Sequence, residues 1–534
     1  NQMFKHQARY LVKRRDPELW NFALQPTNAH RRQLIDQVVA TALPETQDPE
    51  DVSITVKAFM AADLPNELIE LLEKLVVEGS AFSDNRNLQN LLILTAIKAD
   101  KTRVMDYITR LDNYDAPDIA NIAVGSELFE EAFAIYQKYD QHVNGVTVLI
   151  SNVGNIDRAY EFAERVDQPE VWSKLAKAQL DHLRIKEAID SYIKADDATN
   201  FAEVIQIAGR ANKYDDLVRY LQVARKKVRE PAVESELIFA YAMTSRLADL
   251  EEFISTPNIA QIGNVGERCF EAKMYEAAKI LFNNVSNWAR LASTLVYLNE
   301  YQAAVDCARK ANATKVWKEV NAACVDNGEF RLAQICALHL IIHAEELEEI
   351  IRLYERRGNF DELMSLLEAG LGLERAHMGM FTELGILYSK YKPARLMEHI
   401  RLFWQRINIP KVIRACEVAH LWSELVFLYT HYEENDNAAL TIMAHSADAW
   451  EHATFKDIIV KVTNLEIYYK ALRFYLDEQP LLINDLLVVL TPRIDHTRVV
   501  STFQKTNNLP LIKSYLISVQ QVGMSFLESD AYLS

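Results

Sequence analysis

The chain has 534 residues, of which 49% are hydrophobic, and a formal net charge of −17. This balance argues against a dedicated nucleic-acid binder, because phosphate contacts need a dense basic surface. Gly and Pro number only 14 each, and no Gly-, Ser- or Pro-rich linker divides the sequence. One continuous body is therefore expected rather than three or four separate globular domains.

The first residues, Asn1 to Arg15, are polar and basic rather than a signal peptide, and no stretch reaches about 18 uninterrupted apolar residues. Any membrane role is therefore expected to be peripheral. A start at Asn1 suggests a piece of a longer protein. The cations of Lys13–Arg15 and Arg225–Arg229 are interpreted as solvated helix faces, with docking of an acidic partner or a neighbouring copy as the alternative.

The segment Asp63 to Gly79 predicts a helix. Its apolar residues follow helical spacing, at Leu64, Leu68, Leu71, Leu72, Leu75 and Val76. Asp63 and Pro65 supply start signals, and Gly79 suits the stop.

A four-residue signature then recurs every 26 to 33 residues: an apolar or aromatic residue, two polar or small residues, and Ala or Leu. It begins at Phe129, Ile156, Ile185, Tyr214, Leu247, Tyr275, Tyr301, Phe330 and Phe360. About 30 residues hold two helices and two short connections, so the period predicts stacked helical hairpins. The small residue is expected where neighbouring helices approach closely.

The whole sequence is predicted to be all-α, since no segment alternates apolar and polar residues between hairpin turns. Roughly 18 hairpins are expected at this period. The signature weakens after Phe360, through Ala394–Met397, and resumes loosely at Asp436–Ala439.

No chemistry-bearing motif stands out. The five cysteines form no CxxC pair, which favours a reducing cytosol over a disulfide framework. Phosphate-binding glycine loops and GxSxG are absent. No cofactor and no enzymatic activity are predicted.

His339 and His343 are four residues apart, which places them on one helical face. Three interpretations stay open: packing or solvation, a pH-sensing surface pair, and a metal site with Glu345 or Glu346 nearby. The last would make the protein a metal-dependent hydrolase. The pattern is not HExxH, however, and fixes no third ligand.

Three long strings resemble the clathrin heavy chain family, at Asn87–Ala123, Glu161–Leu180 and Leu371–Pro393. The resemblance covers nearly the whole length. It implies a right-handed α-solenoid, or α-zigzag, with clathrin heavy chain repeats at 43–188, 192–333 and 338–484. Residues 1–42 would end a preceding leg repeat, and 487–534 would start a further, truncated or divergent one.

The resemblance implies a structural role at the cytoplasmic face of coated pits and coated vesicles. Leg segments of this family pack with other heavy chains into a polyhedral lattice, bind the clathrin light chain, and meet the membrane only through adaptors. The alternative binding role is an α-solenoid scaffold of another vesicle-tethering or sorting complex, which would capture peptides in a concave groove.

The resemblance also implies site residues. Lys390 matches a family lysine that pairs with acidic light-chain residues, whereas Gln479 replaces a second such lysine. His339, His343 and His496 match histidines expected to make pH-sensitive assembly contacts. The end from Val522 to Ser534 departs from the family pattern, and no function is assigned to it.

Overall fold

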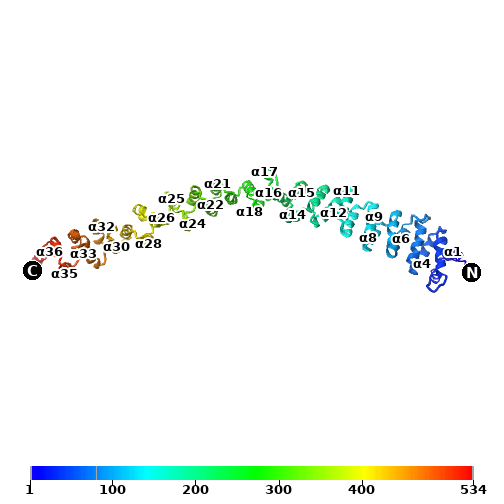
Figure 1. Ribbon diagram of the computed structural model, residues 1–534, viewed down its shortest axis with the longest axis horizontal. Helices are drawn as coiled ribbons and strands as arrows, with labels where there is room; N and C mark the ends of the chain where they lie inside the picture. Colours follow the sequence, from blue (N-terminus) through cyan, green and yellow to red (C-terminus); the bar gives the residue numbers. More distant parts are fainter. Residues whose placement is uncertain (1–2, 80, 532–534) are drawn as a thin grey trace. The chain divides into compact units, whose positions relative to one another are not determined.

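The computed structural model describes residues 3–79 and 81–531, which form 36 α-helices and no β-strand. The chain divides into two compact units, one ending at Asn284 and the other beginning at Val285. In each unit, helices that follow one another in the sequence pack as pairs, and the pairs stack in chain order (Figure 1). The expected α-solenoid of helical hairpins is confirmed.

Unit 1 contains nineteen α-helices within its described residues, together with the π-helical segments η1 and η3 and the 3-10 turn η2. Their bounds are α1 Phe4–Arg14, α2 Pro17–Ala23, α3 Arg31–Gln37, η1 Val38–Ala42, α4 Pro49–Ala61, α5 Pro65–Val76, α6 Arg86–Ala99, η2 Lys101–Arg103, α7 Val104–Arg110, α8 Ala116–Gly125, α9 Phe129–Lys138, α10 His142–Val148, η3 Leu149–Val153, α11 Ile156–Val166, α12 Pro169–Asp181, α13 Ile185–Ala195, α14 Phe201–Arg210, α15 Tyr214–Lys227, α16 Pro231–Met243, α17 Leu247–Ser255, α18 Ile262–Glu271 and α19 Tyr275–Asn284.

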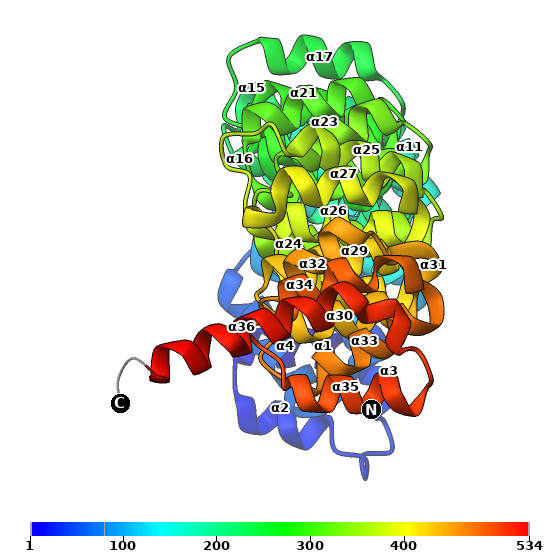
Figure 2. The same ribbon diagram turned by 90° about the vertical axis from the view of Figure 1, so that its left-hand side faces the viewer.

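Unit 2 holds the remaining helices and three 3-10 turns. Their bounds are α20 Trp288–Tyr297, α21 Tyr301–Ala311, α22 Thr314–Asp326, α23 Phe330–Leu338, α24 Ala344–Arg356, α25 Phe360–Gly370, α26 Met378–Tyr391, α27 Pro393–Phe403, η4 Trp404–Arg406, α28 Ile409–Ala419, α29 Trp422–His431, α30 Asn435–Ala444, α31 Ser446–Ala449, α32 His452–Ile459, α33 Glu466–Glu478, η5 Pro480–Leu482, α34 Ile483–Leu490, α35 His496–Lys505, η6 Leu509–Ile512 and α36 Lys513–Ala531. The far end of α36 extends away from α33 and α35 (Figure 2).

The signature marks helix starts. All nine of its leading residues, from Phe129 to Phe360, are the first residue of an α-helix. The small or leucine residue three positions later is fully buried in every case, at Ala132, Ala159, Ala188, Leu217, Leu250, Ala278, Ala304, Ala333 and Leu363. The fourth position of the signature therefore lies in the core, where helices contact one another.

A short turn precedes most of these helices. One of its residues has a positive φ, as at Asn212, Asn299 and Gly328. Asn and Gly tolerate this left-handed region well because their short or absent side chains avoid the clash with the backbone. Leu183 is the unusual member, since a branched apolar side chain stands at φ 62° and is 70% exposed.

The helix predicted over Asp63–Gly79 runs from Pro65 to Val76, with Pro65 at its first position. The proposed start signal from Asp63 is wrong. The N-cap residue is Leu64, which makes no side-chain capping bond, and Asp63 instead occupies the turn with φ 50°. No helix in the described part of the chain is long and apolar enough to span a membrane.

Candidate functional site

Lys390 lies in the last turn of α26 and points its exposed side chain away from the core. The helix is fixed at its other end by His377. The Nδ1 atom of this residue accepts from the Gly379 N–H at 3.1 Å, and Nε2 lies 2.8 Å from the carbonyl oxygen of Ile341. The helix that carries Lys390 is therefore anchored to the turn before α24.

The residues that follow Lys390 hold its end of α26 in place. The Tyr391 ring stacks on Phe360, with centroids 4.0 Å apart and planes 19° apart. Lys392 forms an ion pair with Asp361 at 3.2 Å. Both partners belong to the first turn of α25, so Lys390 extends from a braced backbone.

Lys390 itself forms no ion pair with any residue that the structure describes. Its positive charge nevertheless affects the pKa of Glu383, which lies two turns earlier on α26. Burial raises the pKa of the Glu383 carboxyl, while Lys411 and Lys390 oppose that rise. The lysine ammonium is thus available to a carboxylate from outside the chain.

Gln479 is the C-cap residue of α33, and its backbone N–H donates to the Tyr475 carbonyl at 2.8 Å. Its side chain is half-buried and uncharged. The position therefore cannot supply a second cation.

The prediction that His339 and His343 share one helical face is wrong. His339 is the C-cap residue of α23 and His343 the N-cap residue of α24, and between them the chain makes a turn. Leu340 and Ile341 in this turn are fully buried, so packing ends α23 without a Gly or Pro signal. Both histidines remain exposed.

The His339 ring lies parallel to Trp317, with centroids 4.1 Å apart and planes 10° apart. Although the residue as a whole is exposed, partial desolvation of its ring lowers the pKa of His339, and the nearby Arg309 guanidinium lowers it further. His496, at the first position of α35, is half-buried, and its Nδ1 atom contacts the hydroxyl of Tyr515 on α36. One ring nitrogen of His496 therefore already has a hydrogen-bond partner within unit 2.

The predicted residues do not form one cluster. His339 and His343 lie in the turn beside the start of α26, whereas Lys390 lies at that helix's end. A rise of 1.5 Å per residue puts about 18 Å between the two ends. Within the described residues, no group of three or more His, Cys, Asp or Glu side chains could hold a metal ion.

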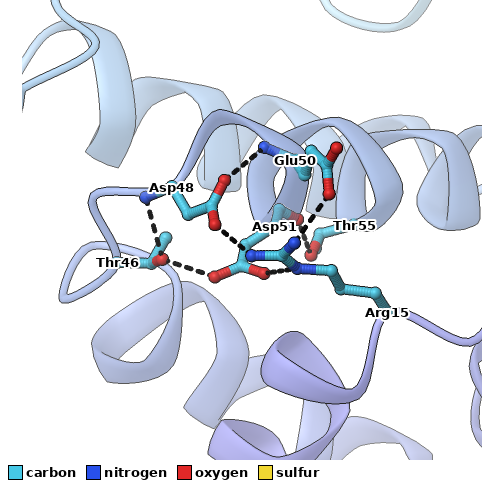
Figure 3. A network of polar contacts seen from close by, with 6 residues as sticks. All are labelled: Arg15, Thr46, Asp48, Glu50, Asp51 and Thr55. Atoms are coloured by element: carbon cyan, nitrogen blue, oxygen red, sulfur yellow. Dashed lines mark hydrogen bonds and ion pairs between the residues drawn. The ribbon is translucent and has the colours of Figure 1, made fainter.

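Arg15, from the first basic cluster, is paired inside the chain (Figure 3). Its guanidinium donates to Asp51 and Glu50 at 2.6 Å each and also contacts Asp48. Thr46 donates to the other Asp51 oxygen at 2.8 Å. Three carboxylates around one guanidinium tie the end of α1 to the start of α4.

The second basic cluster is also partly engaged within unit 1. Arg225 lies over the Phe253 ring at 4.4 Å, and Lys227 pairs with Asp196. Lys226 is exposed and has no ion-pair partner among the described residues. These contacts favour the solvated-face interpretation over a dedicated docking site.

Comparison with known proteins identifies the family to which this sequence is similar. The family model described as "Region in Clathrin and VPS" matches residues 43–187, 192–332 and 338–483. The chain is 66% identical over 523 residues to the clathrin heavy chain of Drosophila melanogaster, covering 98% of this chain and 31% of the relative. It is 65% identical over 520 residues to clathrin heavy chain 2 of Homo sapiens, covering 97% of this chain and 32% of the relative.

The chain thus spans about a third of the length of these curated relatives. The matched regions take up most of the sequence and lie in both units. On these grounds the chain belongs to the clathrin family, and its similarity to clathrin heavy chains extends through nearly its whole length.

Proposed function

We propose that the chain is a structural leg segment of a clathrin coat, which packs with other heavy chains into the coat lattice and binds the clathrin light chain. The observation that carries this proposal is the 66% identity to a clathrin heavy chain across 98% of the chain. A role as a spanning element, rather than as a catalyst, fits a body built from stacked hairpins. Its place would be the cytoplasmic face of coated pits and vesicles, reached through adaptors.

Within the proposed function, Lys390 is the light-chain contact, and its lack of an internal partner supports this role. Replacing Lys390 with Glu should weaken light-chain binding by about 1 kcal/mol, roughly fivefold, which is the scale of an exposed ion pair. Fluorescence anisotropy with a labelled light chain and the purified 534-residue chain, at moderate salt, measures this.

Two further variants sharpen the experiment. Lys226→Glu makes the same charge change at an exposed, unpaired lysine of α15 and should leave binding unchanged. Gln479→Lys should strengthen binding by restoring a second cation. Equal affinity for Lys390→Glu and the parent would reject Lys390 as a contact, and no binding by the intact folded chain would reject the light-chain role.

We also propose that His339, His343 and His496 contribute pH-dependent contacts between legs. Exposure of the first two supports this, because imidazoles at a surface can meet carboxylates of a neighbouring chain. The limits of the leg repeats at 43–188, 192–333 and 338–484 likewise belong to the proposal.

A further inference from the structure

The junction between α22 and α24 has few close backbone contacts. These are the first helices of two successive hairpins in unit 2. The backbones of α20 and α22, and those of α26 and α28, approach each other closely, whereas those of α22 and α24, like those of α28 and α30, do so much less, and α24 and α26 are intermediate. A hollow of about 640 Å³ lies here instead, lined by Thr314, Lys315, Lys318, Glu319 and Glu346.

Ion pairs bridge this junction at both ends. Near the hollow, the Lys318 ammonium lies 3.1 Å from Glu346 and 2.7 Å from Glu349. At the far end, Arg357 meets Asp326 at 2.6 Å. All of these contacts join α24 or its C-cap residue to α22.

Most of the bridging groups are partly open to solvent, whereas the Glu346 side chain is only 18% exposed. The Lys318 side chain is 39% exposed and that of Glu349 is 59% exposed. Ion pairs at such exposure are individually weak, and mobile ions screen them. Apolar packing carries no comparable sensitivity to salt.

A buried aromatic residue lies between the two ionic ends. Tyr354, on α24, is 1% exposed, and it lines a hollow together with Ile335 and Leu338 of α23. Burial raises the pKa of its hydroxyl. The ring therefore lies against the preceding hairpin, between the ion pairs at the two ends of the junction.

We infer that the α22–α24 junction is a salt-sensitive flexing point, closed by Lys318 and Arg357 and pivoting at Tyr354. Screening or removing the ion pairs widens the hollow between the helix starts, while the hairpins on either side stay folded. This device requires neither light chain nor lattice, so it goes beyond the proposed function.

Spin labels on the two walls of the hollow test the inference. Lys315 and Glu345 are exposed near the starts of α22 and α24, and all five native cysteines are buried, so Lys315→Cys with Glu345→Cys allows selective labelling. Double electron–electron resonance on the full chain gives the distance distribution. We expect it to lengthen and broaden between about 0.1 M and about 1 M salt, where the screening length falls to roughly 3 Å.

In this labelled background, Lys318→Met should show the broad distribution already at low salt, with the open population raised about fivefold, and little further response to salt. Arg352→Met is the matched control, because Arg352 pairs with Glu348 within α24 itself. It should behave like the parent. The exchange of Lys318→Glu with Glu346→Lys and Glu349→Lys reverses both ion pairs and should restore the narrow distribution.

A parent distribution that is unchanged by salt would overturn the inference, and this result needs no variant to fold. Equal behaviour of Lys318→Met and Arg352→Met would also overturn it. Circular dichroism should show unchanged helix content in every sample, and a loss of helix at high salt would contradict flexing between intact hairpins.

Discussion

His339 combines two opposing features in one residue: an exposed position and a lowered pKa. Because its folded-state pKa lies below its unfolded value, the unfolded chain binds the proton more readily as the pH falls. The contribution of His339 to stability is therefore present above about pH 6.5, the ordinary histidine value, and is lost as the pH drops through the unfolded and then the folded pKa. A contact that protonates this ring must overcome both its partial desolvation and the positive charge of Arg309.

Replacing His339 with Gln should flatten the pH dependence of unit 2 stability between about pH 7 and pH 5. Urea unfolding of the full chain at several pH values, followed by tryptophan fluorescence, measures this. His343→Gln is the control, since it changes the same residue type in the same turn and leaves the Trp317 stack intact. A parallel shift of both variants would show that the lowered pKa of His339 is not the cause.

At the scale of the element, the nine signature residues show what a sequence can predict. Each begins an α-helix, and the residue three positions later is fully buried. The predictions from sequence are wrong or incomplete where the residues that decide the local structure lie elsewhere in the chain. The break between His339 and His343 depends on burial of Leu340 and Ile341, and the partners of Arg15 lie more than thirty residues away.

The candidate site was predictable only in part. Periodicity alone could show that Lys390 belongs to a helix, and the family resemblance singled it out. Its bracing by Tyr391 and Phe360, and its lack of an internal ion pair, required coordinates. Lys318 gave no sequence signal, because its two partners follow in a different hairpin.

The buried fourth position of the signature should not tolerate a larger side chain. Ala304 is fully buried in α21, so Ala304→Leu should destabilise the chain by about 2 kcal/mol through overpacking. Ala61→Leu, at an exposed position of α4, should cost far less. Chemical denaturation measures both, and equal losses would mean that the position is not a site of close approach.

At the scale of the whole molecule, a destabilising substitution in one unit should leave the stability of the other unit nearly unchanged. In helical repeats, stability is approximately a sum over neighbouring elements, so a defect weakens its surroundings most. Leu71 in α5 of unit 1 and Leu486 in α34 of unit 2 are both fully buried. Each Leu→Ala change should cost about 2–5 kcal/mol locally.

Hydrogen exchange read by mass spectrometry can locate each loss. Leu71→Ala should speed exchange in unit 1 and leave unit 2 near its parent rate, and Leu486→Ala should do the reverse. If either change sped exchange equally throughout both units, the chain would be a single cooperative body rather than a series of neighbours.

The pairing of each helix with its sequence neighbours also bears on how the protein is made. Contacts that close over short stretches of chain form quickly, because little loop entropy is lost in forming them. A hairpin such as α12–α13 can therefore settle as soon as its residues leave the ribosome and then serve as the template for the next. The order of synthesis would then set the order in which the hairpins pack. Little apolar surface would stay exposed until a distant segment of the chain is made.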